Sequence, residues 1–217
     1  MDEIIVKFFI IGLLVESIVL HEMAHGYVAG LFGDQTARQQ GRLTFNPIPH
    51  IDLMWTIVIP IVAYFLSNGT FIIGGAKPVP VNPNNYRRPV LGDICVSVAG
   101  VAVNLLIAVI MILLLNFVHY ASGIVTGTMT ANVLMNVALL NIVLTLFNLI
   151  PIPPLDGSHL FKYILPQELR RSYANLGRTG AGFIILILVI NIPSLWNVFS
   201  IVLFKLRDFL LGSLIFF

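Results

Sequence analysis

Residues 21–25, His-Glu-Met-Ala-His, constrain this chain most, because they form an HExxH pattern that follows directly on a long apolar run. Four residues advance an α-helix by about one turn, so His21 and His25 would lie on one face, one above the other. Two imidazoles so placed can share a divalent metal ion, and Glu22 can act as a general base on a water molecule at the metal. The pattern therefore predicts a metal site for hydrolysis.

The surroundings of the motif indicate a membrane protein. Hydrophobic residues make up 58% of the 217 residues and charged residues only 10%, whereas a soluble domain carries roughly 25% charged residues. The apolar run 4–20 is interrupted only by Lys7 and Glu16. Ionisable groups inside a membrane span are costly and mark functional sites. We therefore expect the HExxH site to lie in the bilayer, on a retained span rather than on a cleaved signal peptide, since the N-terminus lacks a basic region.

Two features of the composition exclude certain partners and certain kinds of site. The net charge of +2 is too small to indicate that the protein binds nucleic acid, and the basic residues lie in loops between apolar segments. The single cysteine, Cys95, excludes an internal disulfide and a cysteine-rich metal site.

The apolar segments predict an all-α polytopic membrane protein with five to six transmembrane helices. We expect one integral-membrane domain over residues 1–217, with a core of about 1–165 and two C-terminal helices over about 178–217. The apolar segments are 4–32, 53–66, 90–118, 129–150, 180–192 and 193–217. The second is short for a span and is followed by a polar break at 67–70. Three prolines within 78–83 exclude a helix there and predict a short extended or β segment.

The distribution of basic residues predicts the orientation. Lys and Arg occur in loops 33–52, 74–93 and 157–178 and are absent from 119–130 and 191–194. Because positive loops face the cytoplasm, the HExxH helix would run inward and place the active site toward the cytoplasmic side of the cell membrane. Both flanks of 53–73 would then lie on the same side, so this segment would be a re-entrant hairpin or a span returned by extended chain.

A catalytic zinc needs a third protein ligand. Asp156 is the best candidate, because it lies at the predicted cytoplasmic end of a helix that runs parallel to the HExxH helix. Gly157 permits a tight turn there, and the preceding prolines restrict the backbone. His159, three residues later, is the competing candidate.

The chain resembles the site-2 proteases, the intramembrane zinc metalloproteases, in their short prokaryotic form without PDZ or CBS domains. The resemblance rests on HExxH in the first span and on residues 148–157, an Asn followed by prolines and Leu-Asp-Gly. Residues 41–52 and 76–83 also resemble the short members, as does Ala-Gly at 99–100 with Asn104. Val101 departs from the family pattern, which has a proline at that place.

This resemblance implies one Zn2+ ion bound by His21, His25 and Asp156, with Glu22 as the general base. It implies that Asn148 binds or polarises the substrate carbonyl. The expected function is an intramembrane zinc endopeptidase that cuts transmembrane segments of substrate proteins, as in regulated intramembrane proteolysis.

The expected partners are transmembrane protein substrates and the lipid bilayer, and a homo-oligomer is left open. A helical substrate hides its peptide bonds and must unwind, and the segment with Val79 and Val81 could pair with the unwound chain by strand addition. Two other functions compete: a membrane metal-ion transporter, which should show internal repeats that the sequence lacks, and an inactive helix-binding scaffold, against which Glu22 argues.

Overall fold

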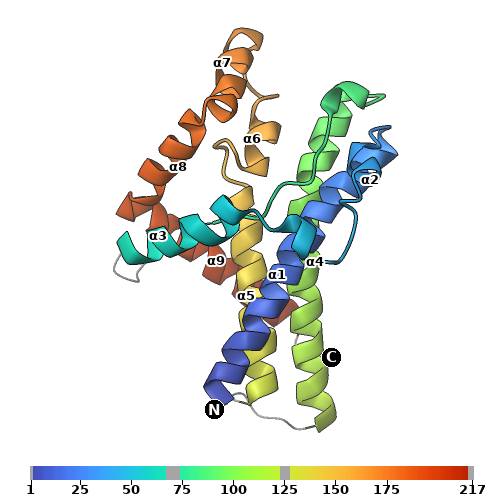
Figure 1. Ribbon diagram of the computed structural model, residues 1–217. Helices are drawn as coiled ribbons and strands as arrows, with labels where there is room; N and C mark the ends of the chain where they lie inside the picture. Colours follow the sequence, from blue (N-terminus) through green and yellow to red (C-terminus); the bar gives the residue numbers. More distant parts are fainter. Residues whose placement is uncertain (1, 67–73, 123–127, 215–217) are drawn as a thin grey trace. The chain divides into compact units, whose positions relative to one another are not determined.

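The computed structural model describes residues 2–66, 74–122 and 128–214, and all regular elements in these ranges are helices (Figure 1). In chain order they are α1 (Asp2–Leu31), α2 (Thr36–Gln39), η1 (Ile48–His50), η2 (Leu53–Val58), α3 (Ile59–Leu66), η3 (Pro83–Asn85), α4 (Pro89–Ser122), α5 (Met129–Asn148), α6 (Asp156–Phe161), α7 (Gln167–Arg178), α8 (Ala181–Ile190) and α9 (Pro193–Leu214). The predicted all-α class is therefore confirmed for the described residues.

The predicted β segment is not found as a strand. Residues 74–82 form neither helix nor strand, and the described residues contain no strand at all. Pro78 and Pro80 have no N–H group, so this segment cannot form a regular ladder along both of its edges. It instead runs as irregular chain whose other amides bond to neighbouring groups, as described below.

Within the described ranges, three helices are long and apolar enough to cross a membrane: Ile4–Leu31, Pro89–Tyr120 and Met129–Asn148. A fourth span results if α7 and α8, which are bent by 84° at their junction, are taken as one. The expected count of five to six stays a prediction. It would also include α9, which carries Lys205, Arg207 and Asp208, whereas the apolar helix Leu53–Val62 is short for a span.

The chain divides into two compact units, residues 1–14 with 97–217 and residues 15–96. The first unit packs around small and branched side chains of three helices, α4, α5 and α9. These buried side chains are Ala108, Ile112, Ala138, Ile142 and Leu210. Alanine at two of the five positions lets the helices approach closely, as is common where membrane helices pack.

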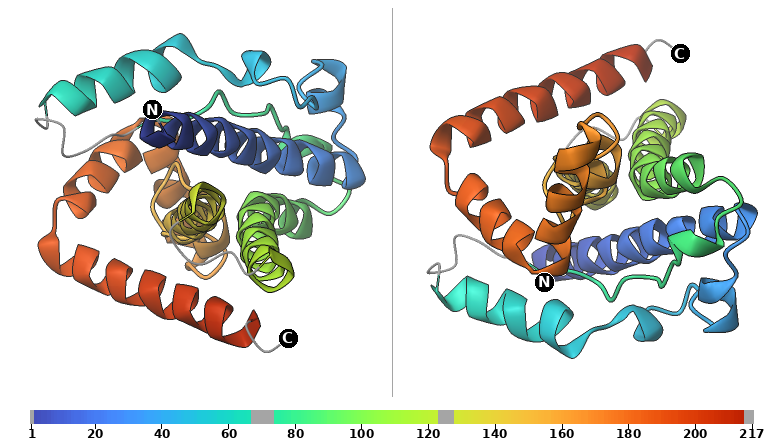
Figure 2. Two further views of the ribbon diagram at one scale, coloured as in Figure 1. Left: turned by 90° about the horizontal axis from the view of Figure 1, so that it is seen from below. Right: turned by 90° about the horizontal axis from the view of Figure 1, so that it is seen from above.

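The C-terminal part of this unit consists of three helices that change direction at two short breaks (Figure 2). Gly180, between α7 and α8, has a φ of 74°, a conformation that favours glycine. Pro193 begins α9 after Asn191 ends α8. Amphipathic α7 is thereby set at 84° to apolar α8.

The second unit holds the HExxH motif. Its hydrophobic cluster contains Ala29 of α1, Tyr86 and Val96, with Val81 packed against it. Gly26 lies so close to Val79 that a Cβ at position 26 would be 2.9 Å from a Val79 methyl group. The proline-containing segment therefore packs directly on the C-terminal half of α1.

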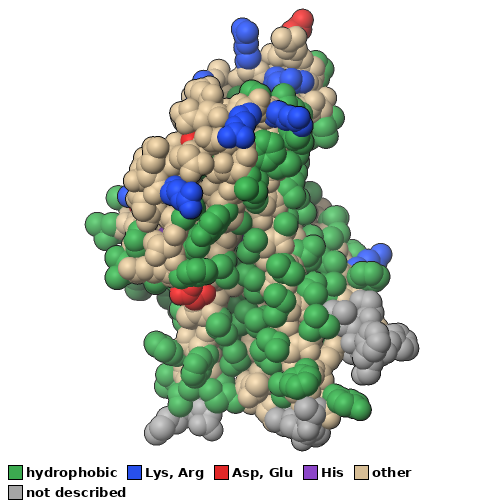
Figure 3. Space-filling model, turned by 90° about the vertical axis from the view of Figure 1, so that its right-hand side faces the viewer, with side chains coloured by type: hydrophobic (Ala, Val, Ile, Leu, Met, Phe, Trp, Pro, Cys, Tyr) green, Lys and Arg blue, Asp and Glu red, His purple; other side chains and the backbone are tan. Residues whose placement is uncertain are grey.

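Large hydrophobic side chains are exposed along α1, α4, α8 and α9. Figure 3 shows many hydrophobic side chains at the surface. Large exposed apolar side chains in this number are unusual on a soluble monomer and are typical of helices that contact lipid.

Candidate metal centre

His21 and His25 face one another on α1. Their Nε2 atoms are 3.1 Å apart, and their rings meet edge to face with centroids 4.7 Å apart. His21 is buried, with 7% of its surface exposed. The spacing of four residues thus places both imidazoles on one helix face, as the sequence predicts.

The environment of His25 selects the nitrogen that can bind a metal ion. Its Nδ1 lies 2.7 Å from the carbonyl oxygen of Val96. A carbonyl can only accept a hydrogen bond, so Nδ1–H is the donor and Nε2 keeps its lone pair. Bonds of this kind fix the tautomer and the ring orientation of metal-binding histidines.

The two histidines fit a zinc ion. Zinc binds imidazole nitrogen at about 2.0–2.1 Å with tetrahedral geometry, which separates two ligand nitrogens by about 3.3 Å. The 3.1 Å between the Nε2 atoms of His21 and His25 is close to that separation. Both nitrogens therefore converge on a point that one ion could occupy with little movement of either ring.

Glu22 is held by a backbone amide from a distant part of the chain. The N–H of Val79 donates a 2.8 Å hydrogen bond to Oε2 of Glu22, and Val79 itself is only 4% exposed. The HExxH motif does not reveal this contact, because the partner lies 57 residues away. The only local signal is that Val79 lies between Pro78 and Pro80, so that it carries the single backbone N–H of residues 78–80.

Three further contacts fix the segment that contains Val79. The guanidinium of buried Arg42 donates to the carbonyl oxygens of Lys77, at 2.8 Å, and Pro78, at 3.2 Å. The N–H of Lys77 donates to His50 O at 2.8 Å. These bonds hold the chain on both sides of Pro78, so the Val79 amide is presented to Glu22 by a fixed backbone.

Asp34 secures the far end of the same segment. Its Oδ2 accepts a 2.6 Å hydrogen bond from Asn82 N–H, and its Oδ1 accepts one of 2.8 Å from Asn85 Nδ2. Burial raises the pKa of Asp34, but the bonds from Asn82, Thr36 and Asn85 outweigh that effect and hold the pKa below its usual range. The carboxylate is therefore ionised in the folded protein at neutral pH.

Asp156, the predicted third ligand, belongs to the other compact unit, and its pairing with the histidines stays a prediction. It is the first residue of α6 and follows the cis peptide bond between Pro153 and Pro154. The backbone here is tightly packed, because a Cβ on Gly157 would lie 2.2 Å from Leu149 O. Only glycine fits after Asp156, which restricts where the carboxylate can lie.

Asn148, predicted to contact substrate, is the last residue of α5. Its Nδ2 donates a 3.0 Å bond to Leu144 O on its own helix, and one amide hydrogen is left for another acceptor. His159, the competing ligand, is exposed on α6. The roles of both residues stay predictions.

The sequence is similar to a peptidase family and to proteins named as zinc metalloproteases. A family model described as Peptidase family M50 matches residues 117–190, which include Asn148 and Asp156. A Bacillus subtilis protein named "Putative zinc metalloprotease YwhC" is 37% identical over 183 residues, covering 83% of this chain and 78% of the relative. "Putative zinc metalloprotease Rip2" of Mycolicibacterium smegmatis is 28% identical over 89% of this chain and 70% of its own length.

The protein of the same name from Mycobacterium tuberculosis is 29% identical over 73% of this chain and 58% of its own length. No solved structure gives a significant match.

Proposed function

The chain belongs to peptidase family M50, and from this premise we propose that it is an intramembrane zinc endopeptidase that hydrolyses peptide bonds in transmembrane segments. The membership confirms the resemblance to the site-2 proteases. The observation that carries the proposal is the pair of converging histidines on an apolar, span-length helix, with Glu22 beside them. The relatives named as zinc metalloproteases support the same reaction class and do not favour a transporter or an inactive scaffold.

We propose His21, His25 and Asp156 as the protein ligands of one zinc ion. Two neutral imidazoles and one carboxylate form a common donor set of catalytic zinc, which leaves a fourth position open. When bound, zinc supplies a Lewis acid that polarises a carbonyl group and makes water a better nucleophile near neutral pH. The fit of the two histidine nitrogens supports this assignment, and the family match over Asp156 supports the third ligand.

Glu22 is the proposed general base. Its carboxylate takes a proton from the attacking water and later gives it to the leaving amine. The Val79 N–H occupies Oε2 and orients the carboxylate, so Oε1 is the oxygen left to carry the proton. A fixed carboxylate needs less reorganisation in the transition state than a mobile one.

The segment with Val79 and Val81 is the proposed substrate-binding element, together with Asn148. A substrate helix must unwind before its peptide bonds can be reached, and extended chain can pair with it through backbone groups. Because Val79 N–H is already bonded to Glu22 and positions 78 and 80 are prolines, the amide at Val81 is the nearest remaining donor. We expect Val81 to make the backbone contact.

The proposed membrane path has five to six spans, with 53–73 as a re-entrant hairpin. Contacts between its flanks support this path. Thr56 Oγ1 donates a 2.7 Å bond to Gly75 O, and Gly75 N–H donates a 3.0 Å bond to Trp55 O. Asp52 caps the first turn by accepting from the amides of Met54 and Trp55. These bonds bring Trp55 and Thr56 next to Gly75, which supports a hairpin.

The proposed location is the cell membrane, with the active site toward the cytoplasm. The basic loops 33–52, 74–93 and 157–178 support this orientation. We treat residues 1–217 as one membrane-embedded domain, with transmembrane proteins as substrates.

The decisive experiment compares the wild type with Glu22→Gln after purification in detergent. Zinc content is measured by elemental analysis, and cleavage is measured on a model transmembrane substrate reconstituted with the enzyme. We expect Glu22→Gln to keep its zinc and to lose at least about 100-fold in cleavage rate, as is typical when a general base is removed. His25→Ala is the matched variant, and it should lose both zinc and cleavage.

Two results would contradict the proposal. Cleavage that persists in Glu22→Gln would remove Glu22 from the mechanism. A wild-type protein that binds zinc but transports it across vesicles without cutting the substrate would favour the transporter.

A further inference from the structure

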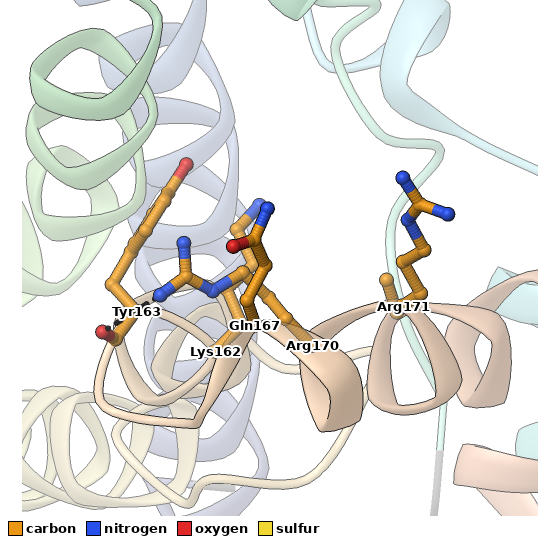
Figure 4. Close-up of a pocket in the computed structure, with 6 residues that line it drawn as sticks. Lys162, Tyr163, Gln167, Arg170 and Arg171 are labelled. Atoms are coloured by element: carbon orange, nitrogen blue, oxygen red, sulfur yellow. Dashed lines mark hydrogen bonds between the residues drawn. The ribbon is translucent and has the colours of Figure 1, made fainter.

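A second chemically distinctive place lies on the segment between α6 and α8, apart from the residues proposed for catalysis. It is an open pocket of about 370 Å³, and its lining is rich in basic and polar side chains (Figure 4). The lining residues are Lys162, Tyr163, Gln167, Arg170, Arg171 and Ala174. None of them takes part in the proposed hydrolysis, so the pocket needs a separate explanation.

Positive charge dominates the pocket and its surroundings. Residues 157–178 contain four basic side chains and a single acidic one, Glu168. The acid does not line the pocket, whereas Lys162, Arg170 and Arg171 do. A site of this kind attracts anions, and arginine in particular matches the geometry of phosphate oxygens.

The basic groups are held in place rather than spread through solvent. The guanidinium of Arg170 donates to Leu165 O at 3.2 Å and to Tyr163 O at 3.4 Å. It also lies over the Tyr163 ring at 5.6 Å, and Lys162 Nζ lies over the same ring at 5.0 Å. The Nε atom of Arg170 is buried and has no hydrogen-bond partner in the described part of the chain. Two cations thus lie over one aromatic ring.

Arg171 provides the accessible charge. It is exposed, and in the view of Figure 4 it points the same way as Gln167, whereas Arg170 reaches toward Tyr163. All three line the pocket, so a ligand there could be contacted by Arg171 and by the neutral amide of Gln167.

The neighbouring surface is apolar, which favours a lipid over a soluble anion. Ile164 and Leu169 are next in sequence to the lining residues Tyr163 and Arg170, and they are 78% and 56% exposed. The segment follows α5, a candidate span, and turns through 84° into apolar α8. A helix with a basic and an apolar side that lies across the direction of an apolar helix has the character of an interfacial helix. Ile164 and Leu169 would then enter the acyl region while the arginines stay at the level of the phosphates.

We propose that this pocket binds the phosphate headgroup of an anionic phospholipid at the membrane surface. Arg170 and Arg171 contact the phosphate, and Gln167 donates to the polar part of the headgroup. Lys162 adds charge from the end of α6. Bound lipid would fix α7 at the interface through contacts that are independent of metal binding and of catalysis.

Native mass spectrometry of the full chain in detergent tests the proposal. The chain is titrated with short-chain phosphatidylglycerol, with phosphatidylcholine of the same acyl length, and with inorganic phosphate alone. Arg171→Gln removes a pocket charge, and Arg178→Gln removes an equal charge from the other end of the same helix as the matched control. We expect one phosphatidylglycerol per chain, weakened about fivefold in Arg171→Gln, since a basic side chain near anionic lipid contributes about 1 kcal/mol. Arg178→Gln should change binding less than about twofold.

The double variant Lys162→Gln with Arg171→Gln should lose about 25-fold, and circular dichroism checks that each variant is folded. Equal binding of the two phospholipids, or equal losses in Arg171→Gln and Arg178→Gln, would overturn the proposal. Binding of inorganic phosphate as tight as that of phosphatidylglycerol would reassign the pocket to a soluble anion.

Discussion

The backbone N–H of Val79 lies 2.8 Å from Oε2 of Glu22 and donates a hydrogen bond to it. The segment that contains Val79 is in turn fixed by Arg42 and Asp34. The orientation of the proposed general base is therefore set by irregular chain rather than by its own helix. Changes in that segment should affect catalysis even where they touch neither the metal nor the substrate.

Val79→Pro should lower cleavage by at least about tenfold and leave zinc content unchanged, because a hydrogen bond to a charged group contributes about 1.5–3 kcal/mol. Val79→Ala is the control, since it shortens the side chain and keeps the N–H. Cleavage rate and zinc content are measured on both. Equal activity of the two variants would show that the amide bond to Glu22 has no catalytic role.

Val81→Pro separates substrate pairing from the orientation of Glu22. If the Val81 amide pairs with unwound substrate, its removal should raise KM several-fold with little change in zinc content, since one neutral hydrogen bond contributes about 0.5–1.5 kcal/mol. Val81→Ala keeps the amide and should behave like the wild type. Unchanged KM in Val81→Pro would exclude strand addition at this position.

Metal content distinguishes the two candidates for the third ligand. Asp156→Ala should lose most of its zinc, whereas His159→Ala should keep it, because the carboxylate and not the imidazole is the proposed donor. Both proteins are dialysed against a weak chelator before elemental analysis. The opposite pattern, with zinc lost only in His159→Ala, would transfer the assignment to the histidine.

Gly157→Ala should destabilise the protein and reduce zinc binding together. A Cβ at this position would lie 2.2 Å from Leu149 O, and overpacking of this kind costs about 1–3 kcal/mol. Gly12→Ala is a suitable control, since a Cβ on that helical residue meets nothing within 4 Å. Thermal unfolding in detergent should show a lower Tm for Gly157→Ala only. An unchanged Tm would mean that the turn before α6 can relax around a side chain.

Asp34 should make stability depend on pH at the acidic end. Its pKa is lowered in the folded protein, so its stabilising effect is complete above the unfolded value of about 3.9 and is lost as the pH falls through the folded value. Asp34→Asn should therefore unfold more easily than the wild type at neutral pH, by about 1–3 kcal/mol. The difference in free energy of unfolding should shrink as the pH falls below about 4. A difference that stays constant with pH would exclude this ionisation as the cause.

Local patterns in the sequence predict the parts of this molecule that depend on neighbouring residues. The helical class follows from long apolar runs, and the approach of His21 to His25 follows from their spacing of four. Of the two alternatives predicted for 78–83, extended or β, the β strand is wrong, because Pro78 and Pro80 interrupt the amides that a ladder needs. Among the described residues three helices are of span length, or four if α7 and α8 form one span, and the expected count of five to six stays a prediction.

Contacts between residues far apart in the sequence cannot be predicted from such local patterns. Nothing in the motif at 21–25 indicates that its glutamate meets Val79, or that Arg42 bonds to the carbonyl oxygens of Lys77 and Pro78. These contacts depend on how the loop after α1 folds back on the helix. That folding is decided by buried polar groups such as Asp34 rather than by periodicity.

The hydrogen bond from His25 Nδ1 to Val96 O has a consequence for how metal occupancy can be detected. Val96 lies in the N-terminal part of α4, so a ligand that restrains the His25 ring also restrains a carbonyl of that helix. Binding and local opening of the helix are then thermodynamically linked, since a ligand specific for the closed form lowers the population of the open one. Slowed amide hydrogen exchange in the first turns of α4 would thus report metal loading without any substrate.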